Sequence, residues 1–196
     1  MSSQLRPALV ILVFFTVLTG IAYPLAVTGI AQTVFPRAAA GSIVMSADKP
    51  IGSSLIGQNF SDPKYFWGRP SATTPQPYAG TASTGSNLGP LNPALTDAVQ
   101  ARVQALRAAD PGNERAVPVD LVTASASGLD PQISIAAALY QAPRIARVRG
   151  LDVIEVRKVL AAHAQGRVLG MFGEPRVNVL ALNLALDNLA TPPASR

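Results

Sequence analysis

The 196-residue sequence contains no cysteine and a single histidine. Without cysteine the chain has no disulfide, no thiolate nucleophile and no sulfur ligand for a metal ion. His163 alone cannot supply a histidine pair for a metal, and it is the one candidate for a histidine general base. We therefore expect no metal site. A chain without cysteine suits oxidising and reducing compartments equally, so this absence assigns no location.

Charged residues are also scarce: they make up 14% of the chain, and the formal net charge is +5. Arg144, Arg147 and Arg149 lie close together in the sequence, but no aromatic residues alternate with them. Nucleic-acid binding usually shows a stronger and more localised basic surface. The sequence therefore predicts no nucleic-acid partner.

No charged side chain occurs between Arg6 and Arg37. The apolar stretch predicts a transmembrane helix over residues 7–34, because about 25 helical residues already span roughly 37 Å. A cleaved signal peptide is the alternative, since Ala38 and Ala40 form an Ala-x-Ala pattern. The apolar region of a signal peptide is only about 7–15 residues long, which favours a retained lipid-embedded anchor.

Two small residues of the predicted span are spaced for contact with another helix. Thr16 and Gly20 form a small-xxx-small pair, which lets a partner helix approach closely. The alternative is a lipid-facing helix whose small residues are incidental. Pro24 is compatible with a membrane helix that packs against neighbours. The positive charges on the two sides of the span nearly balance, so the sequence leaves the orientation open.

After the span, acceptor side chains followed by proline predict three helix starts, because Asn or Asp caps a helix and proline suits its first turn. These pairs are Asn92–Pro93, Asp130–Pro131 and Glu174–Pro175. We expect a further helix after Asp152, a hairpin or extended ribbon around residues 47–50, and a strand at Val119–Thr123 followed by a turn at Ser125–Gly128. No internal repeat is visible.

Residues 60–92 are rich in proline, glycine, serine and threonine, yet they contain Trp67, the only tryptophan of the chain. Disordered linkers are poor in aromatic residues, so we expect long ordered loops wrapped on the domain surface or against a partner. The fold class is a single N-terminal transmembrane helix followed by a small α+β globular domain. The expected divisions are a tail at 1–6, the span at 7–34 and the globular domain at 35–196.

Enzyme motifs are absent from the sequence. Neither G-x-S-x-G nor G-x-x-x-x-G-K-[ST] occurs, and Asp120 and Asp130 are explained as a strand-edge charge and a helix cap. The loop "STGSNLGP", from Ser83 to Pro90, has two interpretations: backbone amides that cradle a phosphate, or a tight turn before the next helix. We therefore assign no catalytic residue.

The ordered segments "GSSLIGQNF", "YFWGRPSA", "GSNLGPLNPAL", "VDLVTASASGLDPQIS" and "GEPRVNVLALNLALD" carry a specific likeness. With the N-terminal span, the chain resembles the C subunit of the Kdp-type potassium-transporting P-type ATPase of bacteria. Two positions depart from the usual pattern of that family: Thr84 stands where a glycine is common, and Ile135 stands where a proline often follows "LDPQIS". The first departure weakens the case for a nucleotide-binding loop.

The resemblance implies an accessory, non-catalytic subunit of a high-affinity potassium uptake pump. Its implied partners are a channel-like subunit that carries potassium and a P-type subunit that hydrolyses ATP. It implies a catalytic chaperone that stabilises the complex and raises the ATP affinity of the hydrolysing subunit, with no tightly bound cofactor and with ATP reached through the complex. The implied location is the bacterial inner membrane, single-pass, with the globular domain on the extracytoplasmic side.

Direct nucleotide contact requires a cytoplasmic domain, whereas an extracytoplasmic one acts on ATP affinity only through coupling across the membrane. Contact of ATP with Ser83, Gly85, Ser86 and Asn87 is kept as a hypothesis. The rival function is a free-standing, membrane-anchored envelope enzyme or ligand-binding module, which would be stable and active without partners.

Overall fold

The computed structural model describes residues 4–46 and 48–190. Two compact units are present, Met1–Ser53 and Ser54–Arg196. The predicted boundary between span and globular domain after residue 34 stays a prediction. The hairpin that follows the span pairs within itself and contributes no strand to the sheet of the second unit.

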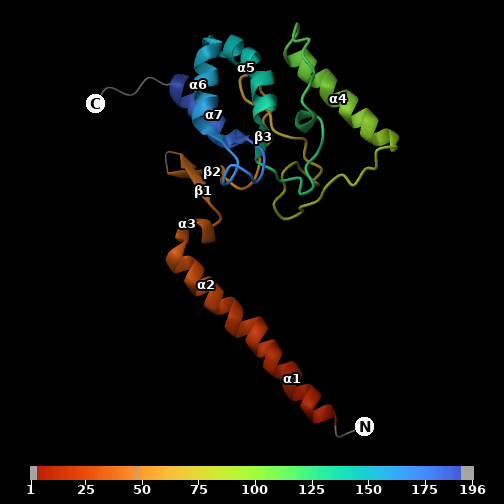
Figure 1. The fold of residues 1–196 in the computed structure, drawn as a ribbon, viewed down its shortest axis with the longest axis vertical. Coiled ribbons are helices and arrows are strands. Elements are labelled where there is room, and N and C mark those ends of the chain that lie inside the picture. Colours follow the sequence, from red (N-terminus) through yellow and green to blue (C-terminus); the bar gives the residue numbers. More distant parts are fainter. Residues whose placement is uncertain (1–3, 47, 191–196) are drawn as a thin grey trace, which may run out of the picture. The chain divides into compact units, whose positions relative to one another are not determined.

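The first unit begins with one continuous apolar helix at Leu5–Val34, long and apolar enough to cross a membrane (Figure 1). It comprises α1 (Leu5–Val17), a π-helical turn (Leu18–Ala22) and α2 (Tyr23–Val34). Pro24 explains the π-helical turn: it donates no backbone hydrogen bond, and in a regular helix its ring would collide with the carbonyl of Gly20. Widening the helix just before Pro24 removes that collision.

A short helix and a hairpin follow the span. They are α3 (Pro36–Ala39), β1 (Ile43–Ser46) and β2 (Lys49–Ser53). The two strands pair antiparallel, with Ser46 opposite Lys49 at the turn, which confirms the predicted hairpin. Residue 47 lies outside the described residues.

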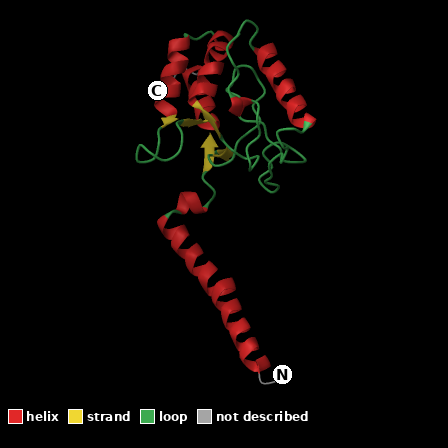
Figure 2. Ribbon diagram, turned by 45° about the vertical axis from the view of Figure 1, so that its right-hand side comes forward, coloured by secondary structure: helices red, strands yellow, loops and turns green. Residues whose placement is uncertain are grey.

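The second unit combines helices with a small antiparallel sheet, which confirms the predicted α+β class (Figures 1 and 2). The sheet order is β3–β5–β4, and Ile133 lies opposite Val177 at its centre. The helices are α4 (Pro93–Ala109), α5 (Ile135–Arg149), α6 (Val153–His163) and α7 (Val179–Ala190), and the strands are β3 (Gln132–Ser134), β4 (Ala164–Gln165) and β5 (Arg176–Asn178). Helix α6 packs against both α5 and α7.

Two of the three predicted helix starts are wrong in the same way. After Asp130–Pro131 and after Glu174–Pro175 the chain forms a three-residue strand before the helix begins. The true caps are Ser134, whose Oγ accepts from Ala137 N at 3.0 Å, and Asn178, whose Oδ1 accepts from Ala181 N at 3.0 Å. The chain thus contains two strand-to-helix units built alike, and their strands pair with each other.

Asp130 has a turn-forming role in place of the predicted cap, because its Oδ1 accepts a hydrogen bond from Gln132 N at 2.9 Å. The predicted strand at Val119–Thr123 is also wrong, since Val119–Leu121 form a single 3-10 turn. The other two predicted caps are confirmed: Asn92 accepts from Ala94 N at 3.0 Å, and Asp152 accepts from Ile154 N at 2.8 Å.

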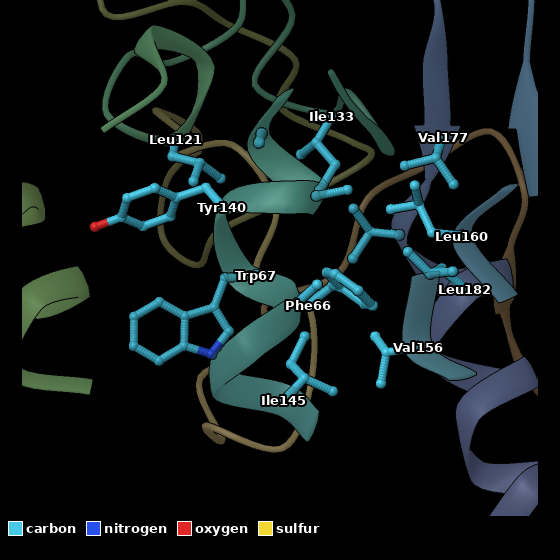
Figure 3. Close-up of a cluster of buried hydrophobic side chains, with 14 of the residues drawn as sticks. Phe66, Trp67, Leu121, Ile133, Tyr140, Ile145, Val156, Leu160, Val177 and Leu182 are labelled. Carbon is cyan, nitrogen blue, oxygen red and sulfur yellow. The ribbon is translucent and has the colours of Figure 1, made fainter. Parts of the chain in front are cut away.

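The core of the second unit covers two sides of α5. Figure 3 shows Trp67, Tyr140 and Leu121 on one side of this helix, and Phe66 on the other side with Val156 of α6 and Leu182 of α7. Phe66 and Trp67 come from the long loop region, not from a helix or strand. The loops predicted to wrap the surface therefore supply part of the core.

Candidate functional site

The loop of residues 58–79 is held in the core by two side-chain amides. Asn183 of α7 accepts from Phe66 N at 2.8 Å and donates to Phe66 O at 3.0 Å. Gln141 of α5 accepts from Trp67 N at 2.8 Å and donates to Trp67 O at 3.1 Å. Each amide satisfies the two backbone groups of one residue, much as a neighbouring strand would. We call Gln141 and Asn183 the amide clamp.

Arg144 completes this arrangement from the next turn of α5. Its guanidinium donates to the carbonyls of Pro63 at 2.6 Å and Tyr65 at 3.0 Å, and it stacks 4.8 Å from the ring centroid of Trp67. Burial lowers the pKa of Arg144 to about 10, which leaves the group charged at neutral pH. A buried cation is tolerated here because carbonyl and amide oxygens surround it.

Three of the segments that carry the family resemblance meet around one cavity of about 480 Å³. "YFWGRPSA" contributes Arg69, "VDLVTASASGLDPQIS" contributes Asp120 and Asp130, and "GEPRVNV" contributes Glu174 and Arg176. The sheet pairing of β3 with β5 brings the last two segments together. The sequence did not reveal this convergence, because it depends on non-local strand pairing.

Charged side chains of both signs line the cavity, and several already have partners. Asp120 accepts from Ser134 N at 2.7 Å and from Ser134 Oγ at 3.1 Å, which fixes the start of α5. Arg69 Nη1 lies 3.2 Å from Asp130 Oδ2, and Nη2 donates to Ala124 O at 3.3 Å. Among the described residues, Arg69 Nε is buried without a hydrogen-bond partner.

The Arg69–Asp130 pair also borders a second cavity of about 560 Å³, lined by the turn at Ser125–Ser127. An ion pair between two cavities suits recognition of a polar peptide segment, since such a segment can form hydrogen bonds with both Arg69 and Asp130. Within the described part of the chain, no group of three metal-ligating side chains gathers here or elsewhere. The arrangement offers hydrogen-bond donors and acceptors of both charge signs.

The four residues predicted to contact a nucleotide have different surroundings in the structure. Ser83 Oγ donates to Ser127 O at 3.0 Å, so this end of the loop packs on the turn at residues 125–128. A Cβ on Gly85 would lie 2.9 Å from Ala126 O, so this glycine permits close backbone packing. Ser86 borders a separate, largely apolar cavity of about 460 Å³ against α4.

Asn87, the fourth of these residues, adopts a left-handed backbone with φ of 52°. The cationic group lining the neighbouring cavity is Arg102, and it is engaged: Nη2 donates to Gly68 O at 3.0 Å and Nε donates to Leu121 O at 3.1 Å. Packing on the turn at residues 125–128 accounts for Ser83 and Gly85. The tight turn of this loop lies at its end, where Asn92 N donates to Gly89 O at 3.0 Å. Nucleotide contact stays a prediction.

Comparison with known proteins extends the likeness to almost the whole chain. The family model described as "KdpC: K+-transporting ATPase, c chain" matches residues 5–188. The chain belongs to the KdpC family. It is 67% identical over 187 residues to the potassium-transporting ATPase KdpC subunit of Variovorax paradoxus, covering 95% of this chain and 97% of the relative. The proteins of the same description from Polaromonas naphthalenivorans and Sorangium cellulosum are 67% and 64% identical, covering 96% and 95% of this chain and 96% and 98% of those relatives.

The predicted helix-packing pair of this KdpC-family chain lies in the middle of the apolar helix. Thr16 and Gly20 are both exposed, and Gly20 falls within the π-helical turn. A Cβ on Gly20 would meet no atom of the described residues within 4 Å. This surface is therefore open to close approach by another helix, and the packing role stays a prediction.

The amide clamp and Arg144 were not identified as functional from the sequence. Arg144 was grouped with Arg147 and Arg149 as a mild basic cluster, yet each of the three has its own acceptor. Arg147 pairs with Asp110 at 2.7 Å, and Arg149 pairs with Asp187 at 2.8 Å. One sequence signal was present: Gln141 and Arg144 stand among alanines and aliphatic residues on a helix whose apolar face must be buried.

Proposed function

We propose that the chain is an accessory subunit of an ATP-driven potassium uptake pump and that it acts by stabilising the assembled complex. The observation that carries the proposal is the family match over residues 5–188, which includes both the apolar helix and the globular unit. The relatives at 60–67% identity are all described as KdpC subunits of a potassium-transporting ATPase. The proposed partners are a channel-like potassium-carrying subunit and a P-type ATP-hydrolysing subunit.

Two surfaces suit this docking role. The Thr16–Gly20 face of the span suits a partner helix, and the cavity around Arg69 and Asp130 suits a polar loop of a partner subunit. The amide clamp keeps the second surface rigid, because Arg69 follows Trp67 by two residues in the clamped segment. A preformed surface loses less conformational entropy on binding.

A rise in the ATP affinity of the hydrolysing subunit is part of the proposal. We place the globular unit on the extracytoplasmic side, where contact with cytoplasmic ATP is excluded. The subunit then acts by binding one conformation of its partners more tightly than another. Coupling of this kind is typically about 1–3 kcal/mol, so its removal weakens ATP binding about 5–150-fold.

The side of the membrane is tested by labelling a single introduced cysteine, since the chain has none of its own. Leu91→Cys is suitable because Leu91 is 96% exposed. With the outer membrane opened, a membrane-impermeant maleimide is expected to label this site before the inner membrane is permeabilised. Labelling only after permeabilisation contradicts the extracytoplasmic placement and revives direct nucleotide contact.

Direct contact is tested separately in the assembled pump by Ser83→Ala, Ser86→Ala and Asn87→Gly. The last change suits the left-handed backbone at this position. If coupling carries the effect, the Kd for ATP changes less than about twofold in these variants. A tenfold weakening in an intact complex contradicts coupling and assigns the loop to the nucleotide.

The rival function, a free-standing membrane-anchored enzyme or ligand-binding module, makes an opposite prediction. Such a protein is recovered without larger partners, and its loss leaves growth at low potassium unchanged. The proposed accessory subunit is recovered with two larger membrane proteins, and its deletion abolishes growth at low potassium.

A further inference from the structure

An exposed apolar hairpin projects between β4 and β5. We call residues 167–174 the apolar tip. Val168 and Phe172 face each other across it, with Val168 N donating to Phe172 O and Phe172 N donating to Val168 O, both at 2.9 Å. Arg167 closes the base by pairing with Glu174, at 3.1 and 3.0 Å from its two carboxylate oxygens. The tip is therefore a defined hairpin of its own.

Four large apolar side chains of the tip face solvent within five consecutive residues. Their exposed fractions are 57% for Val168, 82% for Leu169, 72% for Met171 and 61% for Phe172. Scattered exposed apolar residues are normal on protein surfaces, but a contiguous group marks a contact with protein or membrane. Elsewhere in the globular unit, a loop without helix or strand buries its apolar residues Phe66 and Trp67. Lying between regular elements is therefore not a sufficient reason for the apolar residues of this hairpin to be exposed.

The backbone holds Leu169 outward. Its φ is 54°, a left-handed conformation that is rare for a bulky residue, and Gly170 follows at 73°. Together these two residues turn the chain so that Leu169 has the largest exposed fraction of the four. A strained conformation that displays an apolar side chain to water is typical of a contact surface.

A lipid surface is the partner that fits this chemistry. The same chain carries an apolar helix at Leu5–Val34, and Ser54, the first residue of the globular unit, follows Val34 by only twenty residues. Ser54 O accepts from Asn178 Nδ2 at 2.8 Å, so the chain joins the unit at β5, the strand that leads out of the tip. Arg167, Glu174 and Arg176 lie at the base of the tip and carry a net charge of +1, which suits anionic lipid headgroups.

We propose that the apolar tip inserts into the lipid–water interface and forms a second membrane attachment, in addition to the apolar helix. Leu169, Met171 and Phe172 enter the boundary between headgroups and acyl chains, while Arg167 and Arg176 remain at the level of the lipid phosphates. Two attachments restrict rotation of the globular unit about its tether. This inference needs the membrane span but not the pump, so it stands or fails independently of the proposed function.

The test uses the full chain in vesicles of phosphatidylethanolamine and phosphatidylglycerol. Met171→Cys is labelled with an environment-sensitive fluorophore, and Leu91→Cys serves as the matched exposed control. We expect blue-shifted emission at 171 and at least about threefold stronger quenching there than at 91 by lipids with a nitroxide near the headgroup end of the acyl chain. Equal, water-like emission at both sites overturns the proposal.

Two further measurements separate lipid from protein contact. Adding Leu169→Ser and Phe172→Ser to the labelled chain is expected to lower the ratio of inserted to water-exposed tip by about tenfold or more, because burial of large apolar side chains drives insertion. Unchanged emission of Trp67 verifies that the fold persists. If the label at 171 is water-like in vesicles of the chain alone and shielded only when other membrane subunits are present, the tip is a protein-docking surface and the lipid proposal is wrong.

Discussion

Replacing Gln141 with methionine removes the clamp on Trp67 while keeping the side-chain volume nearly constant. The side chain of Gln141 serves Trp67 N, Trp67 O and Arg144 Nη2. Both backbone groups of Trp67 are then buried without partners, at a cost of about 1–3 kcal/mol each. We expect Gln141→Met to lower the free energy of unfolding by about 3 kcal/mol, a large part of the 5–15 kcal/mol typical of a domain.

Trp67 is the only tryptophan, so its emission reports directly on the clamped segment. Urea unfolding of the full chain in detergent, followed by this emission, gives the free energy of unfolding. With slopes of about 1–3 kcal/mol per molar urea, the expected loss shifts the midpoint by about 1–3 M. Gln104→Met is the matched control, because Gln104 is exposed on α4.

The second clamp residue sharpens this test. Asn183→Leu removes the equivalent bonds to Phe66, the neighbouring residue of the same segment. Because one change already loosens the segment that the other holds, the double variant is expected to lose about 1 kcal/mol less than the sum of the singles. If Gln141→Met unfolds with the control, or if the two losses are strictly additive, the clamp does not hold the segment as proposed.

Three further changes test the loops and helix starts. Gly85→Ala places a methyl group 2.9 Å from Ala126 O and is expected to lower the free energy of unfolding by about 1–3 kcal/mol. Gly89→Ala is the control: a Cβ there meets no atom of the described structure within 4 Å, so the free energy of unfolding is expected to change by no more than about 0.5 kcal/mol. Equal urea midpoints for the two variants contradict the packing role of Gly85. Ser134→Ala removes the α5 cap and is expected to cost about 1–2 kcal/mol by the same assay, and a loss no larger than in an exposed serine variant contradicts it. Burial raises the pKa of Tyr78 above 10.0, so the folded state keeps this proton longer than the unfolded state and the free energy of unfolding falls as pH rises beyond about 10. Tyr78→Phe is expected to show a smaller fall in urea titrations up to about pH 11, and an unchanged fall contradicts it.

Local sequence patterns predicted the features that depend on neighbouring residues. The span, the hairpin and the caps at Asn92 and Asp152 depend on residues that are adjacent in the sequence, and the structure contains all of them. Asp130–Pro131 and Glu174–Pro175 misled because the short strands that follow exist only through pairing with each other. Ser134 and Asn178 were visible as cap residues one position before each apolar helix, so the helix starts could have been placed correctly.

The candidate site depends on contacts that a single sequence does not display. The cavity around Arg69 and Asp130 is assembled from segments more than one hundred residues apart, since Glu174 lines it as well. Gln141 and Asn183 find their partners in the loop region, where no periodic pattern marks which backbone groups are buried. The resemblance identified the family, and only the folded chain shows why its segments belong together.

Affinity purification of the tagged full chain from gently solubilised membranes tests the proposed assembly most directly. The chain is expected to be recovered in fixed proportion with two larger membrane proteins, in a complex that hydrolyses ATP in response to potassium. Two results together contradict its role as an accessory subunit. The chain would be recovered alone, and deleting it would leave the potassium-dependent ATP hydrolysis of the remaining membrane proteins unchanged.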